Sequence, residues 1–133
     1  MPKKHSATFI GVGNSLVILN GHCYAYSGEV SSGGGSALPV TKMLEFTTPS
    51  EPIRAIFSVT NDVTSVTSDV SYKIDFNGIT ILKQILKDEI SKQGGSGHQG
   101  LELVIPPHTL IECYADTAAD PHLFTWMVAG KIL

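Results

Sequence analysis

Five histidines and two cysteines are the residues of this 133-residue chain best suited to bind a metal ion. His22 and Cys23 are adjacent, so in an extended strand they point to opposite faces and cannot ligate one ion without a bulge. His98, His108 and His122 fall in expected loops and lack the short paired spacing that is typical of tetrahedral zinc sites. We therefore expect no metal and no cofactor.

Nucleophilic catalysis needs a nucleophile beside a base, and the sequence offers no pattern for it. The chain has no Gly-x-Ser-x-Gly elbow, and Cys23 and Cys113 are each followed by a tyrosine rather than by the setting of a papain-like nucleophile. Both cysteines lie in strand-like runs, and two cysteines without an export signal are more often free buried thiols than a disulfide. We expect no catalytic residues and no enzymatic activity.

Carboxylates are the second kind of candidate ligand. Four glutamates alternate with apolar neighbours, as residues on solvated strand faces do: Glu29, Glu45, Glu102 and Glu112. Four aspartates lie in expected loops and suit calcium only if two loops converge: Asp62, Asp69, Asp116 and Asp120. We expect these side chains to be solvated.

Tyr24 and Tyr26 are spaced by two and share one strand face, where their rings are able to stack on sugars or bases. Tyrosines in sheets more often bury their rings and leave their hydroxyls in water. The formal net charge of -3 and the pI near 5.9 disfavour a nucleic-acid binder, whose phosphate contacts require a basic excess. We expect no nucleic-acid partner.

The composition indicates one domain whose surface is partly covered by partners. At 14.2 kDa the chain is long enough to bury a core without a metal or a disulfide. Only 16% of its residues are charged, against about a quarter in an average soluble domain, so few charges remain to cover a monomer. The N-terminal residues lack the unbroken apolar stretch of a signal peptide, and no segment reaches a membrane-spanning length. We expect synthesis in a cytoplasm and no membrane partner.

The elements that position these residues are strands, and the clearest signal is Asn77-Gly78. This pair adopts a type I′ turn at low cost and fixes the register of a hairpin, with Ile74 expected opposite Ile81. The alternation places five apolar residues on one face: Tyr72, Ile74, Phe76, Ile79 and Ile81. It places three residues on the other face: Lys73, Asp75 and Thr80.

Further strands are expected throughout the chain. The expected ranges are 16–30 with a turn or bulge at Asn20-Gly21, 42–47, 53–60, 101–105, 110–115 and 123–132. Residues 61–71 fit a loop or a ragged edge strand, and after Leu82 either the strand or a short helix continues. Seven or eight short strands with almost no helix are typical of a β-sandwich or a jelly roll.

Five segments, taken in order, carry a resemblance to a known family. They are Gly21–Gly28, Met43–Thr48, Asp75–Thr80, Leu103–Thr109 and Met127–Lys131. Their order and spacing resemble those of the small jelly-roll structural proteins of double-stranded DNA bacteriophage heads. The resemblance implies an all-β fold, a single jelly-roll β-sandwich of about eight antiparallel strands over residues 9–133, preceded by an extended N-terminal arm over residues 1–8.

The same resemblance implies a capsid decoration (cement) protein, a homotrimer that binds the major capsid protein on the outer surface of the head. The residues expected to reach the capsid from the arm are Pro2, Lys3, Lys4, His5 and Phe9. The outward residues of the last strand are expected at the oligomer interface: Thr125, Met127 and Ala129. The alternative is a receptor-binding or carbohydrate-binding head of a viral spike or fibre, with Tyr, Trp and Asp in apical loops.

Overall fold

The computed structural model describes residues 4–6, 16–32, 38–62, 69–86, 100–118 and 121–133. These residues form ten β-strands and no helix. The strands are β1 (Lys4–Ser6), β2 (Val17–Leu19), β3 (His22–Ser31), β4 (Lys42–Thr47), β5 (Ile53–Asn61), β6 (Val70–Phe76), β7 (Ile79–Leu86), β8 (Leu101–Ile105), β9 (Leu110–Thr117) and β10 (Leu123–Ile132). The all-β class predicted from the sequence is confirmed.

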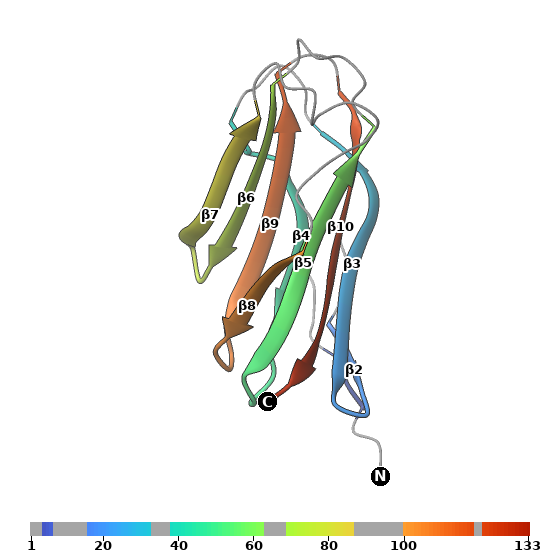
Figure 1. The fold of residues 1–133 in the computed structure, drawn as a ribbon, viewed down its shortest axis with the longest axis vertical. Helices are drawn as coiled ribbons and strands as arrows, with labels where there is room; N and C mark the ends of the chain where they lie inside the picture. The colour runs from blue at the N-terminus through green and yellow to red at the C-terminus, as the bar shows by residue number, and fades with distance from the viewer. Residues whose placement is uncertain (1–3, 7–15, 33–37, 63–68, 87–99, 119–120) are drawn as a thin grey trace.

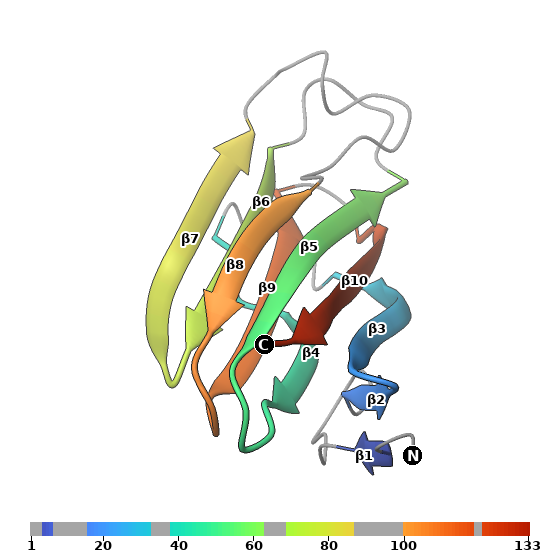
Figure 2. The ribbon, with the colours of Figure 1, turned by 60° about the horizontal axis from the view of Figure 1, so that its bottom comes forward.

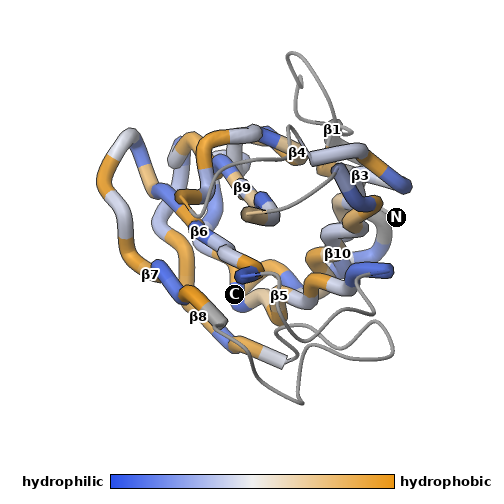
Figure 3. Tube along the Cα trace, turned by 90° about the horizontal axis from the view of Figure 1, so that it is seen from above, coloured by the Kyte–Doolittle hydropathy of each residue, from blue (hydrophilic) through white to orange (hydrophobic). Residues whose placement is uncertain are grey.

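The strands pair entirely antiparallel and form two sheets that face each other (Figures 1 and 2). The six-stranded sheet has the order β1-β2-β3-β10-β5-β8, and the four-stranded sheet has the order β4-β9-β6-β7. Viewed along the strands, the two layers enclose a common interior (Figure 3). The fold is therefore a two-layer β-sandwich, in which each sheet turns one face inward and one face outward.

Two Asn-Gly pairs make the tight turns that the sequence predicted. Asn77-Gly78 has φ angles of 50° and 81°, and Asn20-Gly21 has φ angles of 52° and 79°. Positive φ at both central positions is what a type I′ hairpin turn requires, and asparagine and glycine tolerate it best. Asn20-Gly21 thus separates β2 from β3 and divides the expected strand over 16–30 into two.

The register of the second hairpin differs from the prediction one step beyond its turn. A β-bulge interrupts the pairing of β6 with β7, so that Ile74 lies opposite Leu82 instead of Ile81. The extra residue turns Leu82 toward the core and leaves Ile81 42% exposed. Ile79, beside the turn, is 69% exposed. The predicted pairs Phe76–Ile79 and Asp75–Thr80 are confirmed, and the predicted apolar face was wrong at Ile81.

Strand β7 also runs further than predicted. It pairs with β6 as far as Leu86, so residues 83–86 form a strand and not the start of a short helix. The apolar residues with a helical spacing belong to an edge strand, where the hydrogen bonds to β6 determine the backbone conformation. The rest of the expected helix and the loop to residue 99 lie outside the described residues.

The core lies between the sheets and follows the alternation of the longest strands. In β10, Phe124, Trp126 and Val128 are fully buried, as their shared face predicted. Tyr72 of the opposite sheet meets Phe124 and Trp126 edge-on, at centroid distances of 6.0 and 6.2 Å. The Tyr72 hydroxyl accepts a hydrogen bond of 2.6 Å from the side-chain amide of Asn61. These contacts join the two sheets.

At one end of the sandwich the C-terminus lies beside the start of β5, and the end of β10 separates it from the turn between β2 and β3 (Figure 1). The backbone N–H of Ile132 donates to the Gly21 carbonyl at 2.7 Å, and that of Leu133 donates to the Pro52 carbonyl at 3.0 Å. Strand β10 is therefore held along its length between β3 and β5, at the centre of the six-stranded sheet.

Candidate functional site

The outer face of the six-stranded sheet carries the candidate site. The register of β3, β10, β5 and β8 aligns their outward side chains in rows that cross the strands. The rows are Tyr26, Met127 and Ser58; Tyr24, Ala129, Ile56 and Glu102; and His22, Lys131, Arg54 and Val104. No sequence motif links these residues, because each strand contributes only every second residue to the face.

Large apolar side chains are unusually exposed on this face. Tyr24 and Met127 are 46% and 53% exposed, and Tyr26, Ile56 and Val104 are exposed to similar degrees. The tyrosines were expected to bury their rings, and the structure shows that they do not. Contiguous apolar residues of this kind on a protein surface are typical of a binding surface.

A bulge in β3 aligns the tyrosines with β10. Between Tyr26 and Gly28 the register shifts by one residue, which places Tyr26 opposite Met127. Gly28 has a φ of 68°, and the Ser27 hydroxyl accepts a hydrogen bond of 2.9 Å from the backbone N–H of Trp126. Because the extra residue is absorbed there, both tyrosines remain on the outward face.

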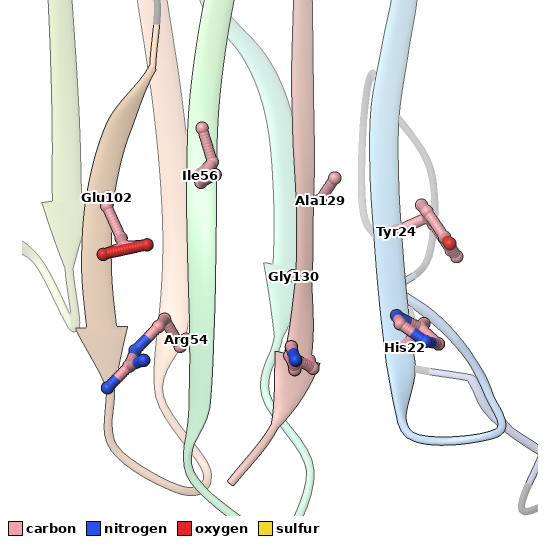
Figure 4. A pocket seen from close by; sticks show the side chains of 8 residues that line it. His22, Tyr24, Arg54, Ile56, Glu102, Ala129 and Gly130 are labelled. Atoms are coloured by element: carbon pink, nitrogen blue, oxygen red, sulfur yellow. The ribbon is translucent and has the colours of Figure 1, made fainter.

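A shallow groove of about 260 Å³ lies in the lower part of this face (Figure 4). Its lining comes from four strands: His22, Tyr24, Arg54, Ile56, Glu102, Ala129, Gly130 and Lys131. Figure 4 shows Tyr24 and His22 on β3 along one margin, with Arg54 and Glu102 on β5 and β8 along the other. The short side chain of Ala129 leaves the space between the margins open.

Gly130 allows the backbones of β10 and β5 to approach each other closely beneath this groove. It faces Cys23 of β3 and Ala55 of β5. A Cβ atom at Gly130 would collide with the Arg54 carbonyl oxygen and lie 2.6 Å from the Ala55 Cα. Only glycine fits this backbone approach, and small residues on both sides let β10 pack tightly between its neighbours.

The groove combines an aromatic ring, aliphatic surface and charges of both signs. Among the described residues, Arg54, Lys131 and Glu102 form no ion pair, in contrast to Lys42 and Lys73 elsewhere in the chain. The groove therefore carries two cationic side chains and one carboxylate. This arrangement is able to bind an anion and to accept hydrogen bonds, but it has no nucleophile beside a base.

The residues predicted for an oligomer interface lie together on the same face. Thr125 and Ala129 are half-buried and Met127 is exposed, all pointing outward from β10. Of the residues predicted to reach a capsid, Lys4 and His5 lie in β1, which pairs with β2 at the edge of the six-stranded sheet. Pro2, Lys3 and Phe9 lie outside the described residues.

The histidines and cysteines lie apart. His22 is exposed and Cys23 buried, on opposite sides of β3 as expected, and His108 is an exposed turn residue. The His122 ring lies 3.2 Å from the Asp62 carboxylate, while His98 falls outside the described residues. Within the described ranges, no three His, Cys, Asp or Glu side chains lie close enough to hold a metal ion.

Both cysteines are free and buried, one in each sheet. Burial raises the pKa of the Cys23 thiol to about 11, and burial also raises the pKa of Cys113 well above its usual value. A thiol held protonated in this way is a poor nucleophile. The two cysteines serve as small apolar residues of the core.

Two of the glutamates expected to be solvated are largely buried instead. Glu45 is only 6% exposed, and it shares the Lys42 ammonium group with Glu112 on the outer face of the four-stranded sheet. The N–O distances are 2.9 and 3.1 Å. Alternation with apolar residues identified the face correctly, but long neighbouring side chains cover the carboxylates.

Asp116 is likewise buried instead of solvated. Its carboxylate accepts hydrogen bonds from the backbone N–H groups of Val40 and Thr41, at 2.6 and 2.7 Å, and from the Thr41 hydroxyl at 2.7 Å. These three bonds attach the segment before β4 to the end of β9. Asp116 was expected in a solvated loop. It instead has a structural role, because its carboxylate holds two segments of the chain together.

The sequence prediction missed Arg54, Ile56, Glu102 and Lys131 as members of one site. A signal was present in β5, where the exposed residues Arg54 and Ile56 put an aliphatic side chain on the polar face of the strand. The other two residues become neighbours only through the order β3-β10-β5-β8. That order depends on tertiary pairing over long sequence separations.

Comparisons with known proteins give no assignment. No protein-family model matches the chain, and no match was found among curated proteins or among solved structures. In the described part of the chain, no helix has the length and hydropathy needed to cross a bilayer. The function is therefore argued from the fold and the site.

Proposed function

We propose that the sandwich is a single jelly roll. The eight strands from β3 to β10 pair first with last: β3 with β10, β4 with β9, β5 with β8, and β6 with β7. A long antiparallel hairpin that is wrapped into two sheets has this pairing, and eight strands in two Greek keys define a jelly roll. The same wrapping accounts for the contacts of β10 with β5 and of β9 with β6.

On this fold we infer a structural role in a virion. The chain is a capsid decoration (cement) subunit that binds the major capsid protein as a homotrimer, on the outer surface of the head of a double-stranded DNA bacteriophage. The resemblance of five ordered segments to small phage head proteins supports this role. The low share of charged residues, 16%, supports a subunit whose surface is covered in an assembly.

The observation that carries the proposal is the exposed apolar surface of the six-stranded sheet. Met127 and Tyr26 lie side by side in its middle, and Thr125 and Ala129 flank Met127 along β10. Tyrosine and methionine are enriched in the cores of protein interfaces. A rigid sandwich with this surface is suited to contact copies of itself while another part contacts the shell.

Strand β1 supplies that second contact. It ends the six-stranded sheet, so one of its edges has no partner strand among the described residues. An edge of this kind offers backbone groups to a partner strand, and Lys4 adds a positive charge. Three such strands in a trimer bind together more tightly than one, and each bridge between capsomers raises the free energy needed to separate them.

Removal of residues 1–8 tests this function directly. We expect the truncated protein to remain a folded oligomer by light scattering, because the eight strands β3 to β10 are intact. We expect it to lose binding to purified heads, where the full chain co-sediments at a fixed copy number near that of the capsomers. Unchanged binding after truncation would refute the role of the arm, and a few copies per particle would instead support a receptor-binding spike.

The alternative of a carbohydrate-binding head placed its aromatic residues in apical loops. Trp126 is fully buried, and Tyr24 and Tyr26 lie on a strand within the sheet. In the described part of the chain these aromatic residues therefore form no apical-loop site, although the sheet face leaves the two tyrosine rings exposed. The decoration role remains the proposal that the surface supports best.

A further inference from the structure

The groove on the six-stranded sheet has features that a protein interface alone does not explain. Its two sides differ in chemistry, with the half-exposed Tyr24 ring on β3 and two charged residues that do not pair with each other, Arg54 on β5 and Glu102 on β8. Ile56 and Ala129 provide an apolar floor between them. A ligand that fits must present an apolar face and polar groups at once.

The charged side chains of the groove indicate which polar groups a ligand must carry. Arg54 and Lys131 are neighbours across β5 and β10, and within the described residues neither has an anionic partner. An arginine guanidinium binds a carboxylate through two parallel hydrogen bonds. Glu102 lies one row away and accepts hydrogen bonds from hydroxyl groups. A phosphate group also suits the two cations, but its oxygens accept hydrogen bonds and give Glu102 no donor, so the site favours a carboxylate on a ligand that carries hydroxyl donors.

The size of the groove limits the ligand to about one ring. Its volume of about 260 Å³ falls below the range of roughly 300–1,000 Å³ that holds drug-sized ligands. The groove also crosses the strands in mid-sheet, where the backbone groups already pair with each other. In the described part of the sheet, the free edge of β8 lies beyond Glu102, outside the space between the two margins, and across β3, β10 and β5 an extended peptide would find only paired backbone groups, which favours a compact ligand.

We propose that this groove binds a carboxylated saccharide residue. The sugar ring lies against Tyr24 and the floor formed by Ile56 and Ala129. The carboxylate is held by Arg54 and Lys131, and the ring hydroxyls donate hydrogen bonds to Glu102. Ala129 also belongs to the proposed oligomer interface, which is centred on Met127 one row away, so a saccharide and a second copy would compete for this residue. The inference concerns ligand binding by the folded chain and does not depend on the proposed role in a capsid.

A matched set of small probes tests the proposal on the full-length protein. The probes are methyl β-D-glucuronide, methyl β-D-glucoside, which has a hydroxymethyl group in place of the carboxylate, and sodium acetate, which has no ring. Titrations followed by amide chemical shifts in NMR give both the affinity and the residues affected. We expect the glucuronide to shift the amides of Tyr24, Arg54 and Ala129, with the other two probes binding at least about tenfold more weakly, because a hydrogen bond to a charged group contributes about that factor.

Two variants distinguish the groove from a general effect of charge. Arg54→Gln is expected to weaken glucuronide binding about tenfold or more, and Arg54 is exposed, so the variant folds. Lys83→Gln removes one positive charge from an exposed position on the other sheet and is expected to leave binding unchanged. Equal binding of the glucoside or of acetate, shifts away from the groove, or insensitivity to Arg54→Gln would each overturn the proposal. Failure to bind heads would leave these results unaffected.

Discussion

The four-stranded and the six-stranded sheet each turn one face outward, and the two faces differ in how their charged side chains are paired. On the four-stranded sheet, Lys42 bridges Glu45 and Glu112, and Lys73 lies 3.4 Å from Asp75. On the six-stranded sheet, the described residues include no ion pair for the cations of the groove. On the first face, Lys42 and Lys73 are paired within the chain, whereas in the described part of the chain the second face offers unpaired charged groups to another molecule.

The paired face is a network and not a set of separate contacts. The Tyr114 hydroxyl donates to Glu112 at 3.2 Å, and the Lys73 ammonium group lies 4.2 Å from the centre of the Tyr114 ring. Thr80 donates to Asp75 at 2.8 Å. All four strands of the sheet thus contribute to one polar layer. Removing one member of such a network leaves the remaining buried charges without their partner, so the folded state depends on the network staying intact.

The largest effect is expected from a charge placed in the apolar part of the six-stranded sheet. Met127→Asp puts a carboxylate at the centre of the proposed interface, where removing it from water costs several kcal/mol per subunit. We expect the proposed trimer of 14.2 kDa chains to become a monomer that keeps its circular dichroism spectrum. Light scattering after size-exclusion chromatography measures the mass.

Ile79→Asp is the matched control for this change. Ile79 is also an exposed apolar residue, but it lies on β7 of the other sheet. The comparison between the faces predicts that this variant remains an oligomer. A monomeric wild type, or an oligomer that tolerates Met127→Asp, would show that the exposed face does not mediate self-association.

The sequence allowed good prediction of the elements because strand alternation is a local property. The strands at 42–47 and 123–132 have the predicted bounds, and the buried face of β5 follows from Ile53, Phe57 and Val59. Period-two burial acts on each strand separately, so it is visible without knowing which strands are neighbours. The Asn-Gly turns are equally local.

Features that depend on neighbouring strands were not predictable in the same way. The bulge that places Leu82 instead of Ile81 opposite Ile74 is evident only when β7 is paired with β6. The burial of Glu45 depends on Lys42 and on Glu112 of β9, 67 positions further along the chain by residue number. The groove requires the order of four strands. In each case the missing information is a register between distant segments, which local propensity does not contain.

A second, smaller effect compares the loss of one cation on each face. Lys42→Met leaves Glu45 and Glu112 without their shared partner, and Glu45 already has one buried oxygen with no hydrogen bond among the described residues. We expect a loss of about 2–3 kcal/mol in the free energy of unfolding, because breaking a buried pair strands the remaining charges. Urea denaturation at pH 7 measures it.

Arg54→Met is the counterpart on the six-stranded sheet. Arg54 is exposed and lacks an ion pair in the described part of the chain, so its loss is expected to change stability by less than about 0.5 kcal/mol. Equal costs for the two substitutions would mean that the pairing of charges does not distinguish the faces. If only Arg54→Met lowered the free energy of unfolding, the six-stranded face would be the one whose charges stabilise the fold.

The smallest effect is expected from alkaline pH, and it reports on the same network. Hydrogen bonds from Lys42 to Glu45 and to Glu112 raise the pKa of Lys42 above its usual value of 10.5. The folded protein therefore holds this proton more tightly than the unfolded chain, so the stability it contributes is fully present below pH 10.5 and is lost as pH rises through the folded-state pKa. The difference in stability between wild type and Lys42→Met should narrow above pH 10.5.

The buried thiol of Cys23 provides the internal reference for this experiment. Its pKa, raised by burial from 9.0 to about 11, makes every variant lose stability between those values, since the unfolded chain releases the proton first. Arg54→Met should follow the wild-type curve throughout, because no paired cation has been removed. A gap between wild type and Lys42→Met that stays constant up to pH 12 would show that the two ion pairs contribute nothing to folding. The burial of Glu45 and Glu112 would then have to be offset by packing alone, and the four-stranded face would no longer differ from the six-stranded face in its electrostatics.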